Sequence, residues 1–275
     1  MIDSHQHYWQ YNKTDFAWIG DDMQLLQRNF LPNDLKPQMN AVGVSATIAV
    51  QARQCQDETE WLLALAQEND WIAGVVGWVD LCSDDLEAQL NRFSKNQKLA
   101  GVRHVVHDEP DDDFLLHEDF LRGIELLSQF DLTYDLLLFE KHLPVAIKFV
   151  EKFPHQRFVL DHISKPLIKD QILSPWDVNL RELAKFPNVD CKASGMVTEA
   201  DWAAWTPDDL KPYLDVVFDA FGPDRILLGS DWPVCTVAGS YQDVMKIPLQ
   251  YIQSLSEVDQ IKIQSENARR AYRLR

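Results

Sequence analysis

The sequence predicts an α/β fold built as a single (β/α)8 barrel of the TIM type, with a long first βα loop. Short β-rich runs alternate with longer helical stretches along the 275 residues of the chain. Repeated strand–helix units imply parallel strands joined by helical crossovers, and eight such units in a chain of this length fit a closed barrel. A doubly wound open sheet is the competing fold. Its first turn is usually rich in glycine, whereas the first turn here reads His5-Gln6-His7.

The expected strands and helices follow one another along the chain. Strands are expected at residues 1–5, 46–51, 73–79, 100–106, 133–138, 157–162, 189–193 and 226–231. Helices are expected at residues 58–69, 85–94, 119–130, 142–153, 178–186 and 208–221. The first of these helices carries its apolar residues at helical spacing, namely Trp61, Leu62, Leu65 and Ala66. The connection over residues 8–39 is long and aromatic, and we expect it to fold over one end of the barrel.

The composition is that of an ordinary globular chain, 46% hydrophobic and 25% charged, and we expect one domain spanning residues 1–275. The net charge of -17 makes nucleic acid and anionic membranes poor candidates as partners, because both are polyanions. The four cysteines are widely spaced and form no C-x-x-C pair, which favours reduced thiols in the cytoplasm. The N-terminus shows no signal peptide, and no apolar run approaches the ~20 residues of a membrane span.

Polar side chains gather at the C-terminal ends of strands that are otherwise apolar. A strand covered on both faces is expected to be apolar throughout, so these residues need a reason. The ends of all barrel strands converge on one rim, where the active sites of such folds are built. The residues concerned are Asp3, His5, His7, Arg103, His104, Tyr134, Asp135, Asp161, His162, Lys192 and Asp231.

Two imidazoles on one strand face can ligate a single metal ion. His5 and His7 share a face at period two, and His162 or Asp231 would complete the coordination. Each residue also has a purely structural interpretation. The H-x-H pair suits an exposed turn, His162 suits a hydrogen-bonded core histidine, and the carboxylate of Asp231 suits the cap of a turn.

The remaining charged and aromatic candidates are less specific. Arg103 stands between apolar residues and is expected to be buried and paired, whereas Lys165 and Lys192 are interpreted as solvated or ion-paired lysines. Tryptophans at strand ends or in the first loop suit stacking on a sugar ring, or simply covering the barrel mouth. These tryptophans are Trp9, Trp18, Trp78 and Trp232.

The chain resembles the amidohydrolase superfamily, and within it the sugar-lactonase branch that includes L-fuconolactonase-like and L-rhamnonolactonase-like enzymes. The resemblance runs nearly end to end and rests on longer segments as well as the H-x-H, histidine and aspartate. These segments are Asp3-Ser-His-Gln-His-Tyr-Trp, Phe16-Ala-Trp-Ile-Gly, Val50-Gln-Ala-Arg, Asp57-Glu-Thr, Gly101-Val-Arg-His, Tyr134-Asp, Leu160-Asp-His-Ile-Ser-Lys-Pro, Ser194-Gly-Met-Val-Thr-Glu-Ala-Asp-Trp and Gly229-Ser-Asp-Trp-Pro-Val-Cys.

The sequence departs from the binuclear members of that superfamily. Those enzymes usually bring a bridging lysine from strand four and a histidine from strand five, where this chain has Arg103-His104 and Tyr134-Asp135. We therefore expect one divalent metal ion at most, and zinc as that ion. Whether the reaction needs it stays open. Its ligands would be His5, His7, His162 and Asp231.

The resemblance implies a hydrolase that opens a sugar-acid lactone, L-fuconolactone or a related L-aldonolactone, to the aldonic acid. Asp231 would activate the water, and the other expected catalytic residues are His162, Arg103 and His104. The expected substrate-binding residues are Trp18, Arg53, Trp78, Tyr134 and Trp232. Only the small-molecule lactone is expected as a partner, and the oligomeric state stays open, a homo-oligomer included.

Three alternatives remain at this point. A zinc-dependent decarboxylase of an aromatic acid shares the H-x-H, histidine and aspartate pattern. A hydrolase of a non-sugar lactone such as a pyrone dicarboxylate would need several arginines at the rim, where Arg53 and Arg103 are the main ones. A sugar-acid binding protein without activity is the third, since a fold alone never proves a reaction.

Overall fold

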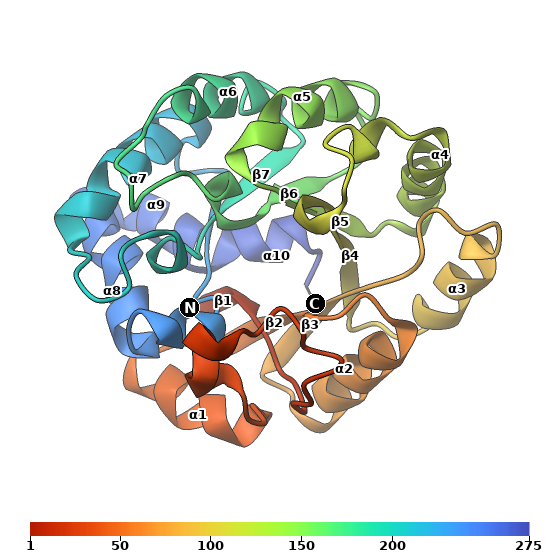
Figure 1. Cartoon of the computed structure of the whole chain (residues 1–275), viewed down its shortest axis with the longest axis horizontal. Coiled ribbons are helices and arrows are strands. Elements are labelled where there is room, and N and C mark those ends of the chain that lie inside the picture. Colours follow the sequence, from red (N-terminus) through yellow and green to blue (C-terminus); the bar gives the residue numbers. More distant parts are fainter. Residues whose placement is uncertain (275) are drawn as a thin grey trace.

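The computed structural model describes residues 1–274 and shows eight parallel strands in the order β1 to β8 (Figure 1). The strands are β1 (Ile2–Gln6), β2 (Ala46–Val50), β3 (Ile72–Gly77), β4 (Leu99–Val105), β5 (Thr133–Leu137), β6 (Phe158–Leu160), β7 (Val189–Ala193) and β8 (Ile226–Leu228). The first and last strands meet just beyond their C-terminal ends. There the Asp231 amide donates to the His5 carbonyl at 2.8 Å and the His7 amide donates to the Trp232 carbonyl at 2.6 Å. The predicted (β/α)8 barrel is confirmed.

Helices surround the strands as an outer ring in Figure 1, except α10, which lies across the middle of the view. They are α1 (Pro32–Ala41), α2 (Gln56–Glu68), α3 (Leu86–Phe93), α4 (Glu118–Leu127), α5 (Leu143–Glu151), α6 (Trp176–Leu183), α7 (Pro207–Phe221) and α8 (Tyr241–Tyr251), followed by α9 (Glu257–Ile261) and α10 (Asn267–Ala271). None of the helices in residues 1–274 has the length and apolar character needed to cross a membrane.

The structure differs from the predicted elements in three places. Helix α1 lies inside the segment expected to be loop, so that residues 7–31 connect it to β1. Helices α8, α9 and α10 were not predicted. Strand β6 ends two residues earlier than expected and β8 three residues earlier, because His162 and Asp231 adopt positive φ angles of 53° and 58° that no strand accommodates.

The barrel interior is apolar at one end and charged at the other. At the N-terminal end, Ile48, Val76 and Leu227 pack with Ala268 and Tyr272, which belong to α10 and the residue after it. The Thr133 hydroxyl of β5 donates to the Ala271 carbonyl of α10 at 2.6 Å and so holds α10 against this end of the barrel. Toward the C-terminal end, side chains from β4, β5 and β7 and from the residue after β6 replace the branched apolar residues usual in such barrels with buried charges.

Candidate active site

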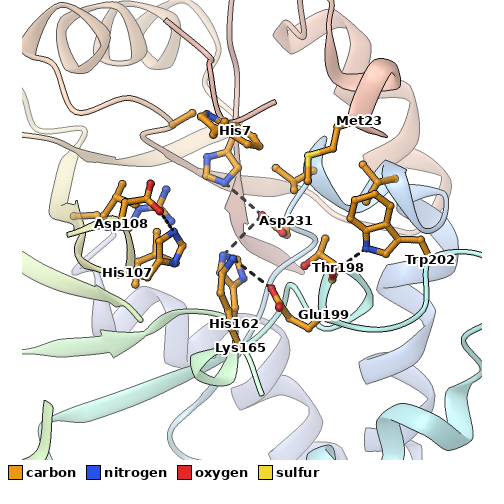
Figure 2. A pocket seen from close by; sticks show the side chains of 17 residues that line it. His7, Met23, His107, Asp108, His162, Lys165, Thr198, Glu199, Trp202 and Asp231 are labelled. Carbon is orange, nitrogen blue, oxygen red and sulfur yellow. Dashed lines mark hydrogen bonds and ion pairs between the residues drawn. The ribbon is translucent and has the colours of Figure 1, made fainter. Parts of the chain in front are cut away.

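A cavity of about 350 Å³ opens at the C-terminal ends of the strands. Its walls come from the ends of β4 and β5 and from the segments that follow β1, β2, β4, β6, β7 and β8, so residues far apart in the sequence share it. Figure 2 shows Asp231 near its centre, with His7 above and His162 below. This is the rim at which the sequence analysis placed the site.

His5, His7, His162 and Asp231 form one compact cluster at this cavity. Asp231 Oδ1 lies 3.4 Å from His7 Nε2, 3.8 Å from His162 Nε2 and 3.9 Å from His5 Nε2. The Nε2 atoms of His5 and His7 are 3.1 Å apart. All four residues are buried, Asp231 with 4% of its surface exposed and His5 with none.

Partners behind the cluster orient its imidazoles. His7 Nδ1 lies 2.8 Å from the Val50 carbonyl oxygen. A carbonyl only accepts, so the proton of a neutral His7 sits on Nδ1 and its Nε2 presents a lone pair to the cluster. Nδ1 of His162 lies 3.0 Å from Ser194 Oγ, and Nδ1 of His5 lies 3.3 Å from Asp161 Oδ1.

Burial sets the charges of these groups. It lowers the pKa of His5 and of His162 well below the usual value, although neighbouring carboxylates oppose it. Both rings are therefore neutral at physiological pH. Burial alone would raise the pKa of Asp231, but His162 and His7 outweigh it and hold that pKa below the ordinary 3.8. The cluster thus combines an ionised carboxylate with the neutral imidazoles of His5 and His162.

This donor set suits one metal ion. Ligand atoms of His5, His162 and Asp231 all lie within 4.8 Å of one another, and His7 Nε2 lies 3.1 Å from His5 Nε2 and 3.4 Å from Asp231 Oδ1. Imidazole nitrogens and a carboxylate oxygen are donors that zinc prefers. The carbonyl behind His7 and the carboxylate behind His5 are partners typical of metal-binding histidines. No second group of three or more potential ligands gathers among residues 1–274, which fits the expectation of a single ion.

A layer of buried charge supports the cluster from inside the barrel. Lys192 Nζ lies 2.6 Å from Asp135 Oδ2, 2.9 Å from Asp161 Oδ1 and 3.1 Å from His5 Nδ1. Burial alone would raise the pKa of Asp161, but Lys192, His5 and Arg103 hold it well below its usual value. Two cations and two carboxylates thus share the interior beneath His5, and the ion-paired interpretation of Lys192 is the one the structure supports.

The turn after β6 has an unusual backbone. His162, Ile163, Ser164 and Lys165 have φ angles of 53°, 49°, 63° and 47°, a left-handed conformation that costs roughly 1–2 kcal/mol per residue without glycine. Neighbouring segments hold the turn in place. The Trp176 indole donates to the Ile163 carbonyl at 2.7 Å, and Ser164 Oγ donates to the Phe139 carbonyl at 3.2 Å. Strain maintained in this way is typical of functional sites.

Glycine is required where β7 ends. Gly195 has a φ of +62°, and a Cβ atom there would overlap the His162 ring. Any other residue would displace that imidazole from the cluster.

Arg103 and His104, two of the expected catalytic residues, lie on opposite faces of β4. Neighbouring residues of a strand point to opposite faces, so Arg103 points into the barrel and His104 points out. Arg103 NH1 donates to Asp161 Oδ2 at 2.9 Å, and its NH2 donates to Gln51 Oε1 at 2.9 Å. His104 Nε2 instead contacts Glu109 Oε1 at 2.7 Å, behind the cavity wall. His104 was expected to be catalytic, but the structure does not bring it to the site.

Among the expected substrate-binding residues, only Trp18 lines the cavity. The Trp78 indole donates to His104 Nδ1 at 3.3 Å on the outer side of β4. Tyr134 packs against Phe149 and Phe158 between β5 and the helices, because it is one residue out of phase with the inward-pointing Asp135. The other two expected residues also lie outside the cavity wall: Trp232 packs against Tyr8 and Phe30, and Arg53 pairs with Asp15.

Several cavity residues were not among the candidates. They are Met23, Ala52, Val105, His107, Asp108, Leu137, Lys165, Thr198, Glu199, Trp202, Val234 and Val237. Lys165 had been interpreted only as solvated or ion-paired, and it does pair with Glu199 at 3.3 Å. The signal that could have identified Lys165, Glu199 and Trp202 was their presence in segments that carry the resemblance.

Comparisons with known proteins agree with this geometry. The amidohydrolase family model matches residues 2–274. The L-fucono-1,5-lactonase of Burkholderia multivorans is 43% identical over 284 aligned positions, covering 99% of this chain and 96% of that one. The enzyme of the same name from Burkholderia ambifaria is 38% identical and covers 88% and 83%.

A solved structure supports the same relationship. The crystal structure of an amidohydrolase from Burkholderia multivorans with bound zinc superimposes with a TM-score of 0.96 at 42% identity, covering 100% of this chain and 99% of that one. The family match over nearly the whole length and the two relatives above 30% identity establish the relationship. This chain belongs to the amidohydrolase family.

Proposed function

We propose that this chain hydrolyses the six-membered lactone of L-fuconic acid, or a closely related L-aldonolactone, to the open-chain aldonic acid. The observation that carries this proposal is the ionised Asp231 beside three imidazoles at a cavity of about 350 Å³, a volume suited to a small molecule. Relatives at 43% and 38% identity bear the name L-fucono-1,5-lactonase.

Asp231 acts as the general base. Its carboxylate accepts a proton from the attacking water and returns that proton to the ring oxygen as the C–O bond breaks. The pKa of Asp231 lies below the ordinary 3.8, so this carboxylate is ionised near neutral pH. General base catalysis of this kind accounts for about 10²–10⁴-fold of the rate.

We propose zinc as the ion that His5, His7, His162 and Asp231 hold, because the donor set is of the kind zinc prefers and a relative carries bound zinc. A divalent ion at this place would polarise the lactone carbonyl as a Lewis acid and favour the ionisation of water. Whether turnover requires it is decided by the assay below.

The cavity favours a neutral, amphipathic substrate. Figure 2 shows His107 and Asp108 on one side of Asp231, Met23 and Trp202 on the other, and Glu199 below it. Hydroxyl groups suit the polar side, and the apolar face of a sugar suits the other. A pyrone dicarboxylate would need free arginines, but the arginine that lines this cavity is already paired with Asp161.

The test is a pH-indicator assay on a panel of aldonolactones, with metal-stripped and zinc-loaded enzyme. We expect rapid acid release from L-fuconolactone and slower release from lactones of other configuration. Release of CO₂ from aromatic acids, with no acid from any aldonolactone, would instead indicate the decarboxylase alternative.

We place the protein in the cytoplasm. All four cysteines are free thiols, and Cys191 and Cys235 are buried, which suits a reducing compartment. A labelled chain found outside the cytoplasm would contradict this assignment.

A further inference from the structure

The charges that line the cavity are unbalanced. Three carboxylates face it, from Asp108, Glu199 and Asp231, against two cations, Arg103 and Lys165. Hydrolysis of a lactone produces a carboxylate, and its transition state places negative charge on the carbonyl oxygen. The side chains of this cavity therefore repel both, unless one of its own cations is free to bind them in addition to the metal ion proposed above.

Arg103 is not free. Its NH1 donates to Asp161, and its NH2 donates to the side chain and the main chain of Gln51. Its Nε is buried from solvent, and 4% of the side chain is exposed. These contacts belong to the charged layer beneath His5 and occupy NH1 and NH2. Nε has no hydrogen-bond partner within residues 1–274 but is shielded from solvent, so the guanidinium is held in that layer.

Lys165 has donors to spare. Its side chain is 20% exposed, and within the described chain its ammonium makes one ion pair, with Glu199 Oε1 at 3.3 Å, and no hydrogen bond. An ammonium carries three N–H donors. Figure 2 shows Lys165 beside His162 and Glu199, below Asp231, and its charge acts on both Asp231 and His162.

The left-handed turn fixes where this ammonium lies. His162 and Lys165 are its first and last residues, with φ angles of 53° and 47°. The Lys165 amide closes the turn by donating to the His162 carbonyl at 2.8 Å. This left-handed turn, held by its neighbours, therefore positions both His162 of the cluster and the Lys165 ammonium at the cavity.

The imidazoles do not supply the missing donor. His7 directs its Nδ1 at the Val50 carbonyl and presents a lone pair to the cluster, whereas Nε2 of His5 faces His7 and Nε2 of His162 faces Asp231 within the cluster. A metal ion bound by these nitrogens would leave them with no free donor either. We therefore propose that Lys165 is a catalytic residue that binds the lactone carbonyl oxygen as it becomes an oxyanion and then holds the product carboxylate. This inference rests on the lactone hydrolysis proposed above.

Hydrolysis forms one C–O bond and breaks another. The water oxygen bonds to the carbonyl carbon, the water proton passes to Asp231, and the carbonyl π electrons move to the oxygen that faces Lys165. The ring C–O bond then breaks, and Asp231 returns the proton to the ring oxygen. The carboxylic acid formed loses its proton to solvent, and the resulting carboxylate remains paired with the ammonium.

Glu199 acts as a positioning residue in this scheme. Its carboxylate holds the Lys165 ammonium in a loose ion pair, and its negative charge opposes the product carboxylate. Its removal is expected to tighten product binding and to slow product release.

The test compares Lys165→Met, Lys165→Arg and Glu199→Gln with wild type. Lys165→Met is expected to lower kcat by about 10²–10³-fold with little change in KM, and Lys165→Arg to recover part of the loss. Inhibition by L-fuconate is expected to weaken at least tenfold in Lys165→Met, whereas inhibition by the neutral alditol L-fucitol stays constant. Glu199→Gln is expected to bind L-fuconate more tightly than wild type.

Lys169→Met is the matched control, because Lys169 is exposed in the same loop and its loss removes the same charge from outside the cavity. If Lys165→Met does not fold, Lys165→Gln supplies the same comparison. An active wild type with kcat and L-fuconate binding unchanged in the folded variant overturns the role of Lys165 alone. A wild type inactive on every aldonolactone overturns the proposed function as well.

Discussion

His7 Nε2 lies 3.4 Å from Asp231 Oδ1, although one residue follows the first strand and the other follows the last. The hydrogen bonds that join β1 to the segment after β8 run through the same place, since the His7 amide donates to the Trp232 carbonyl. The contacts that close the barrel therefore also bring His7 and Asp231 together. A chain that failed to close the sheet here would also lose the site.

Zinc is expected to stabilise the protein. Binding to the folded state alone adds about 2.7 kcal/mol at a concentration 100-fold above Kd, which raises the Tm of a chain of this size by roughly 5–10 °C. Differential scanning fluorimetry with and without zinc measures the shift. His162→Ala is expected to abolish it, whereas His117→Ala keeps it, because His117 pairs with Asp111 at the surface. Equal shifts in both variants would mean that zinc binds elsewhere.

Lys192 is expected to be important for stability. Its replacement by Met leaves Asp135 and Asp161 buried without their shared cation, and breaking a buried pair in this way costs about 3–5 kcal/mol. The control is Lys211→Met, which removes an exposed i,i+4 pair with Asp215 worth only about 0.3–0.5 kcal/mol. Urea unfolding gives both values. A cost below about 1 kcal/mol for Lys192→Met would show that the charged layer is dispensable.

Glu58 is expected to make stability fall as the pH rises. Burial raises its pKa from 4.5 to about 7, although the amides of Arg53 and Ala52 donate to it. Between these two values the folded chain binds more protons than the unfolded chain, so the free energy of unfolding decreases with increasing pH. Urea unfolding at pH 5 and pH 8 measures this decrease.

Glu58→Gln is the comparison for that measurement. It keeps an acceptor for both amides but does not titrate, so its stability is expected to change less over the same range. Parallel pH profiles for wild type and variant would rule out a raised pKa at Glu58.

The sequence was sufficient to predict the barrel and the four cluster residues, because both follow from patterns local to each strand. Apolar runs predicted where the strands lie, and polar residues at the ends of those runs predicted which rim of the barrel carries the site. Which side chains of a strand point into the barrel was harder to predict. His104 and Tyr134 stand next to the inward-pointing Arg103 and Asp135, and a shift of one residue moves a side chain to the other face of the sheet.

Other features depend on contacts that no local pattern contains. Lys192 looked like a residue for the surface, yet it is fully buried because two carboxylates from other strands meet it. Strand β6 looked long enough to include His162, but the turn held by Trp176 and Phe139 ends it at Leu160. Interactions between distant segments decide both cases.

The most direct test of the account is the turnover of Asp231→Asn on L-fuconolactone. The variant keeps the shape of the side chain but removes the base, and we expect kcat to fall by about 10²–10⁴-fold. Asp70→Asn, at an exposed position between α2 and β3, is expected to retain wild-type activity. Near-normal turnover by a folded Asp231→Asn enzyme would contradict the assignment of Asp231 as the base.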